Sequence, residues 1–293
     1  MHSRDILLPG DVSVRFKTTS PVFGDERNRL LAAAYLPGVQ FLDEPLRRVS
    51  LTLSFVESAE KRLAVRGRSI QLADRWSGDG SLLDLLHLTY SAARRCWLRQ
   101  GLYSVHSACV VRDNGGVLLV GHSGAGKTTV AMELLQQGGK LLSGNKTLVT
   151  VDGSVVKAVA GTRTMTTRKS VSAVGSPGGS EYSGRQAFAL EDNVYSGAAA
   201  VDISLIALVA LNDGVADLAK IEPVSALHRL FPFFLDTVYA DTVLLAGGDV
   251  FVSKPPQGCQ KTLSVKLSQA LAKVPVYSVI GSRDFISHSL ERQ

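Results

Sequence analysis

The residues with the clearest chemical purpose run from Gly121 to Thr129 and read GHSGAGKTT. They fit the pattern G-x-x-x-x-G-K-[ST] of a phosphate-binding loop. In such a loop the glycines let backbone N–H groups point at a phosphate, and the helix that follows adds a partial positive charge. We expect Lys127 to reach the terminal phosphates of ATP and the Thr128 hydroxyl to bind Mg²⁺. The predicted nucleotide-binding residues are Gly121, Ser123, Gly124, Gly126, Lys127, Thr128 and Thr129.

A phosphate-binding loop becomes a catalyst only with an acidic partner, because Mg²⁺ and the proton of the nucleophile must both be held. Asp213 ends the apolar run LIALVALND and is one candidate, although Asn-Asp-Gly is equally a good turn sequence. With Asp213 as its acid, the chain would be a P-loop switch or ATPase. Asp152 and Glu181 are further candidates, and Glu181 is also explained as an ordinary loop residue.

The flanking sequence must place this loop between a strand and a helix. GVLLV precedes it, and Asn114-Gly115 predicts a hairpin before that strand. After the loop the sequence predicts a helix over 127–137, ended by Gly138. Further along, the patterns predict a buried strand at 201–211, helices at 224–236 and 261–273, and a final strand at 274–280. The expected fold class is α/β.

The residue pattern differs between two regions of the chain. Residues 1–100 alternate short apolar runs with turns, which predicts a small β-rich unit that ends in a helix capped by Ser81. Residues 101–293 form the predicted P-loop domain. Within that domain, residues 161–186 are rich in Ser, Thr and Gly, so we expect a long mobile loop. Its basic side chains either clamp a phosphate or an acidic peptide, or are simply solvated; they are Arg163, Arg168, Lys169 and Arg185.

The block from Ser104 to Gly153 resembles the C-terminal catalytic region of the HPr kinase/phosphorylase family. The resemblance implies a P-loop core of the phosphoenolpyruvate-carboxykinase/HPr-kinase type, with ATP, Mg²⁺ and a serine hydroxyl as reactants. It also implies that His106 lies near the reaction centre, although a histidine hydrogen-bonded within a strand is an equal alternative. Where the family has two aspartates, this chain has Gly144 and Asn145. Losing a general base costs a factor of about 10²–10⁴ in rate.

Two functions follow from the resemblance. In the first, the chain is a degenerate member that binds a peptide or small protein, with nucleotide binding weak or vestigial. HPr-kinase-like proteins occur beside clusters for ribosomally synthesised, modified peptides, the crocagin pathway among them, so a precursor peptide is the expected partner. In the alternative, the chain is an active ATP- and Mg²⁺-dependent kinase that phosphorylates a serine. HPr kinases assemble as hexamers, which makes a homo-oligomer the corresponding expectation.

The composition limits which partners and which cellular location we expect. The 293 residues are 45% hydrophobic and 20% charged, which is ordinary for a globular protein. The net charge of +6 is dispersed along the chain, so we expect no nucleic-acid partner. Cys96, Cys109 and Cys259 are scattered, which favours a reducing, cytoplasmic location. No apolar run approaches the length of a membrane span, and we expect neither a signal peptide nor a membrane partner.

Overall fold

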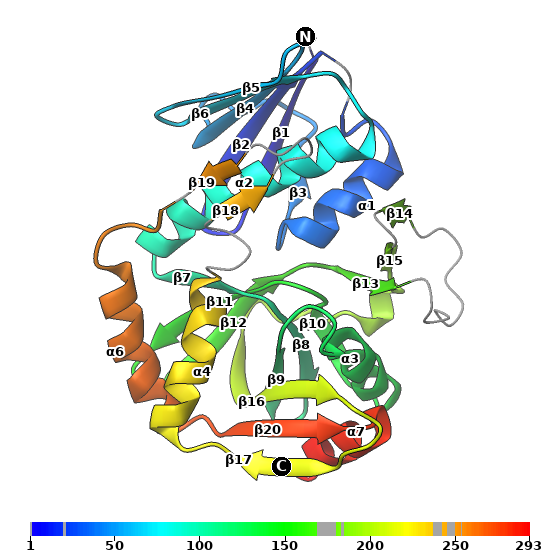
Figure 1. Cartoon of the computed structure of the whole chain (residues 1–293), viewed down its shortest axis with the longest axis vertical. Coiled ribbons are helices and arrows are strands. Elements are labelled where there is room, and N and C mark those ends of the chain that lie inside the picture. The colour runs from blue at the N-terminus through cyan, green and yellow to red at the C-terminus, as the bar shows by residue number, and fades with distance from the viewer. Residues whose placement is uncertain are drawn as a thin grey trace.

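Two β-sheets, one above the other in Figure 1, organise the chain. The structure is a computed structural model that describes residues 2–19, 22–168, 180–182, 185–236, 242–244, 250–252 and 254–293. Helices pack against both sheets, so the fold is of mixed α and β type, as the sequence predicts.

The N-terminal sheet has six strands in the order β3-β1-β2-β4-β6-β5. Their bounds are β1 (His2–Leu8), β2 (Val12–Thr18), β3 (Gln40–Phe41), β4 (Leu51–Glu57), β5 (Arg62–Arg66) and β6 (Ser69–Asp74). Strand β4 shows why one face of this sheet is inside: its alternation buries Leu51, Leu53 and Phe55 and leaves the residues between them half-buried. Strand β5 ends the sheet and pairs with β6 alone within the described part of the chain.

Helix α2 (Asp79–Arg99) lies between the two sheets and is buried along most of its length. Leu86, Ala93 and Trp97 belong to the N-terminal core. On the other side, the Tyr90 hydroxyl forms a hydrogen bond of 2.7 Å with Ser104 Oγ, in strand β7 (Leu102–Val105) of the second sheet. A helix covered on two sides explains why so few of its residues are charged and exposed.

Two predictions about helices in this unit need correction. Helix α2 begins at Asp79, because Gly78 is its N-cap; the Ser81 hydroxyl accepts from the Ser77 N–H at 2.9 Å from inside the helix. Helix α1 (Glu26–Tyr35) was not predicted at all, although the Asp25 carboxylate caps it by accepting from the Asn28 N–H at 2.7 Å.

The second sheet is centred on β16 (Val201–Leu211). Around it lie β7, β8 (Ser107–Arg112), β9 (Gly115–Val120), β10 (Lys140–Ser143), β11 (Thr147–Asp152), β12 (Val155–Gly161), β17 (Asp217–Lys220) and β20 (Val276–Gly281). Strand β16 runs parallel to β9 and to β20, and antiparallel to β12. The carboxyl ends of β9, β16 and β20 therefore meet at one edge, the position at which parallel sheets bind ligands.

Helices cover both faces of this sheet. Helices α3 (Lys127–Gln136) and α7 (Arg283–Glu291) contribute to one core, and α4 (Pro223–Leu235) and α6 (Cys259–Leu271) contribute to another. The predictions for α3, α4, α6 and the two strands at 201–211 and 274–280 are confirmed within two residues. Helix α7 and strand β17 were not predicted.

The prediction of one long loop over 161–186 is wrong for the described residues. Strand β13 (Thr164–Arg168) pairs with β15 (Arg185–Ala189), which pairs with β14 (Ser180–Tyr182). Thr162, Thr164 and Met165 are fully buried, because threonine fits a packed strand although it is polar. The remaining described elements are the 3-10 turn η1 (Asp192–Val194) and the hairpin of β18 (Thr242–Leu244) and β19 (Val250–Val252).

Candidate functional site

The loop Gly121–Gly126 lies where the sequence predicts it, between the end of β9 and the start of α3. Residues 117–120 of β9 are buried between β8 and β16, which fixes the point from which the loop leaves the sheet. Gly126 is the N-cap of α3 in a left-handed conformation, with φ of 93°. The first backbone N–H groups of α3 have no partner within the helix, and they face the loop. Such an arrangement is suited to an anion.

Contacts with β16 hold the loop in place. The Leu211 N–H donates to the Ala125 carbonyl at 3.0 Å. A Cβ at Gly126 would lie 2.2 Å from the Leu211 side chain, in addition to the positive φ at this residue. Gly126 is therefore required twice, by its backbone conformation and by the close approach of β16.

Lys127 lies inside the concavity of the loop, where its side chain is 7% exposed. Its ammonium donates to the Gly121 carbonyl at 2.8 Å and to the His122 carbonyl at 3.0 Å. The loop geometry and the buried cation fit a phosphate group. An entering phosphate oxygen would compete with these two carbonyls for the same protons. The His122 ring is exposed, and it contacts the Phe233 ring of α4, with centroids 5.0 Å apart.

A pocket of about 390 Å³ lies beside the loop, at the carboxyl ends of β16 and β20. Its lining includes Thr129 of α3, Asp213 after β16, and Arg283 and Asp284 at the start of α7. The Arg283 Nε lies 3.1 Å from Asp284 Oδ1, so these two charges are paired with each other. Asp213 thus shares a pocket with Thr129, the residue after the predicted Mg²⁺ ligand Thr128. Among the described residues there is no cluster of three or more His, Cys, Asp and Glu that would hold a metal without nucleotide.

Gly144 has no room for a side chain. A Cβ at this position would lie 2.2 Å from the backbone carbonyl oxygen of Thr164, at the start of β13. The Gly144 N–H donates to the Thr162 carbonyl at 2.9 Å, which keeps the two segments together. Because backbone atoms cannot turn aside as a side chain can, an aspartate here requires β13 to move.

Asn145 is used in packing. Its backbone N–H donates to Thr162 Oγ1 at 2.9 Å, and its side-chain amide donates to the Ala34 carbonyl of α1 at 3.3 Å. Its own carbonyl accepts from the Ser107 N–H at 3.1 Å. The structure thus brings the segment after His106 against residue 145, and His106 itself is buried at 9% exposure.

The sequence analysis missed a buried polar cluster next to this segment, made by Tyr90, Arg94, Ser104, Lys146 and Asp236. The Lys146 ammonium lies 3.3 Å from Asp236 Oδ2 and 3.5 Å from the centre of the Tyr90 ring. The Tyr90 hydroxyl also donates to Asp236, and the Arg94 guanidinium donates to the Leu235 carbonyl. Burial lowers the pKa of Lys146, and the Asp236 carboxylate opposes that effect.

Asp152, another predicted acid, is the last residue of β11, at the opposite end of that strand from Asn145. Glu181 lies in β14, but its side chain is outside the described residues, as are those of Arg168 and Arg185 and the whole of Lys169. The Arg163 guanidinium lies over the Tyr195 ring, 5.2 Å from its centre.

Comparison with known proteins gives a likeness among solved structures and none among sequences. No family model matches the chain, and no curated protein sequence is similar to it. Among solved structures, the Hpr(Ser) kinase/phosphatase from Coxiella burnetii is similar over 64% of this chain and 91% of its own, with 10% sequence identity and a TM-score of 0.31. What the loop binds must therefore follow from its own residues. No helix in the described ranges is both long enough and apolar enough to cross a lipid bilayer.

Proposed function

We propose that this chain is a binding protein on an HPr-kinase-like, phosphate-binding scaffold, and that it does not transfer phosphate. It binds a peptide or small protein, such as the precursor of a modified peptide, and it binds ATP with Mg²⁺ only weakly. The observation that carries the proposal is the packing at Gly144, where the backbone of β13 fills the space that a catalytic carboxylate needs.

Two observations support the loss of catalysis. The sequence resemblance equates residues 144 and 145 with the family's aspartates, and neither offers a carboxylate. The Asn145 amide donates to a carbonyl of α1, so it is committed to packing between the units. A phosphoryl transfer that lacks its general base is slower by a factor of about 10²–10⁴.

The contacts of Lys127 support weak nucleotide binding. Its ammonium already has two carbonyl partners, so a phosphate gains less than it would from a solvated lysine. If ATP binds, Thr128 would be the Mg²⁺ ligand from the loop and Asp213 the nearby candidate acid, and the ion would neutralise phosphate charge. A scaffold that has lost its chemistry can keep the recognition of a polypeptide.

The test combines binding and turnover. The melting temperature is measured with millimolar ATP, with Mg²⁺ or EDTA, for the wild type and for Lys127→Ala. In parallel, γ-labelled ATP is incubated with a pooled library of serine peptides. We expect a shift of at most a few degrees that Lys127→Ala abolishes, since a ligand at about 100 times its Kd gives about 2.7 kcal/mol. Label that enters a peptide only with the wild type would instead establish an active serine kinase.

A second candidate function is nucleotide hydrolysis or switching with Asp213 as the acid. The observation that favours it is the pocket that Asp213 shares with Thr129. In this case ATP hydrolysis should depend on both Lys127 and Asp213, and Asp213→Asn should remove it. Hydrolysis that is equal in wild type and Asp213→Asn excludes this function.

A further inference from the structure

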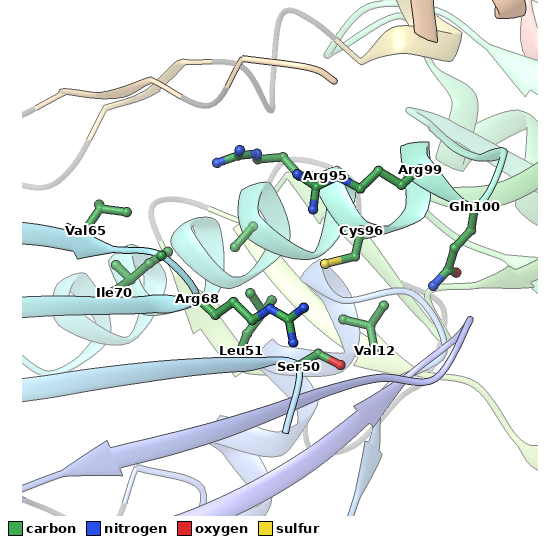
Figure 2. A pocket seen from close by; sticks show the side chains of 12 residues that line it. Val12, Ser50, Leu51, Val65, Arg68, Ile70, Arg95, Cys96, Arg99 and Gln100 are labelled. Atoms are coloured by element: carbon green, nitrogen blue, oxygen red, sulfur yellow. The ribbon is translucent and has the colours of Figure 1, made fainter. Parts of the chain in front are cut away.

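A second hollow, of about 540 Å³, lies in the N-terminal unit between the C-terminal half of α2 and the sheet (Figure 2). Its apolar lining comes from strand residues such as Val12, Leu51 and Ile70. Helix α2 contributes Arg95, Cys96 and Arg99, and the turn between β5 and β6 contributes Arg68. We call this hollow the α2 groove. It is far from the phosphate loop in the sequence, and none of its lining residues belongs to that loop.

The charged residues that line the α2 groove are all basic. Arg68, Arg95 and Arg99 line it, and no acidic residue does. None of the three forms an ion pair with any residue that the structure describes. All three guanidinium groups influence the Cys96 thiol. Burial raises the pKa of this thiol, and each of the three positive charges opposes that rise. Three cations that converge on an apolar hollow favour an anion with an apolar body.

The edge of β5, which no strand in the described ranges pairs with, favours an extended peptide over a small molecule. Val65 of β5 lines the groove and is 47% exposed. It pairs with the buried Ile70 of β6, so its side chain is on the sheet face that α2 covers. A strand added beyond β5 would place every second side chain on that same face, beside Val65.

We propose that the α2 groove binds an extended peptide segment in which every second side chain faces the groove and these groove-facing side chains are apolar and acidic in turn. The apolar residues contact Val65 and the apolar lining, while the carboxylates pair with the arginines. This proposal rests on the proposed binding function and names the surface and the chemistry of the partner.

The test uses fluorescent octapeptides and the full chain without nucleotide, followed by anisotropy. A valine–glutamate peptide made of two Val-Ser-Glu-Ser repeats presents both kinds of side chain on one face and should bind, whereas peptides of Val-Ser-Lys-Ser or Ser-Ser-Glu-Ser repeats should bind at least about tenfold more weakly. Arg99→Glu and Val65→Asp should each weaken the first peptide by roughly five- to tenfold, a range set by the modest value of exposed ion pairs and the added repulsion. The exposed residues Arg292 and Val224 supply matched controls, and Arg292→Glu and Val224→Asp should leave affinity unchanged.

The outcomes separate the two proposals. If the valine–glutamate peptide fails to bind, or binds the groove variants as tightly as the wild type, the α2 groove is not the site. The proposed function fails on a different result, the transfer of labelled phosphate to a peptide, so the two failures are distinguishable. If dodecanoate binds with the same dependence on Arg99 and Val65 while no peptide does, the occupant is a small amphiphile and the peptide proposal is wrong.

Discussion

Lys146 and Asp236 form the most deeply buried ion pair described, with side chains 8% and 0% exposed. Asp236 ends α4 in a left-handed conformation, with φ of 48°, so its carboxylate turns back toward α2. Within the described part of the chain, its second oxygen, Oδ1, accepts no hydrogen bond. The carboxylate therefore depends on the Lys146 ammonium and the Tyr90 hydroxyl.

This dependence predicts a strong coupling in stability. Lys146→Met should lower the free energy of unfolding by about 3 kcal/mol, because it leaves a buried carboxylate without its cation. Asp236→Asn should restore part of that loss in the double variant, since asparagine also tolerates the left-handed conformation. Urea unfolding of the wild type, the two single variants and the double variant measures the coupling. If the two losses of unfolding free energy were strictly additive, a direct ion pair would be contradicted.

The sequence could not reveal this cluster, because its members come from positions 90, 94, 104, 146 and 236 on four elements. The phosphate loop is different in kind. Its glycines, Lys127 and Thr128 are contiguous, and the strand before them and the helix after them are specified by local patterns. Sites built from one segment are predictable, and sites that tertiary packing assembles are not.

The same contrast holds for elements. Helices α3, α4 and α6 show apolar periodicity over ten or more residues and were predicted, whereas β13 is a short strand of threonine, methionine and arginine in polar surroundings. Its burial comes from a long-range partner: Thr164 lies against Gly144, and Met165 belongs to the core beside α3. Composition alone therefore indicated a loop.

The contact between β13 and residue 144 gives a prediction about restoring the family residue. Gly144→Asp should lower the melting temperature by several degrees, because forcing a side chain into packed backbone costs about 1–3 kcal/mol. It should not create phosphate transfer. Asn145→Asp is the matched control, since position 145 already carries a side chain of the same size. A stable Gly144→Asp protein with labelled-phosphate transfer would contradict both the packing and the proposed function.

At the scale of the whole molecule, α2 joins the two units. Trp97 donates to the Pro9 carbonyl at 2.8 Å on one side, and Tyr90 reaches Ser104 and Asp236 on the other. His87 lies on the same helix, with its ring 4.9 Å from that of Tyr35 in α1. Burial, together with the Lys146 charge, lowers the pKa of His87 to about 4.

His87 should make this junction sensitive to acid. Between pH 6.5 and 4 the unfolded chain binds a proton at this residue that the folded chain does not. Stability should therefore be full above pH 6.5 and fall as the pH drops toward 4. Melting curves from pH 7.5 to 4.5 measure this loss of stability, and in His87→Gln the melting temperature should fall by a few degrees less over the same range. Parallel curves for the two proteins would show that another group is responsible.

The resting contacts of Lys127 bear on how such a chain evolves. Because the loop carbonyls of Gly121 and His122 satisfy its ammonium, the loop is a stable piece of architecture without any ligand. Selection for folding alone would then preserve the lysine and the glycines around it long after a lineage stopped using nucleotide. An intact motif of this kind therefore does not by itself establish that nucleotide is used, and the acidic residues around it have to be considered as well.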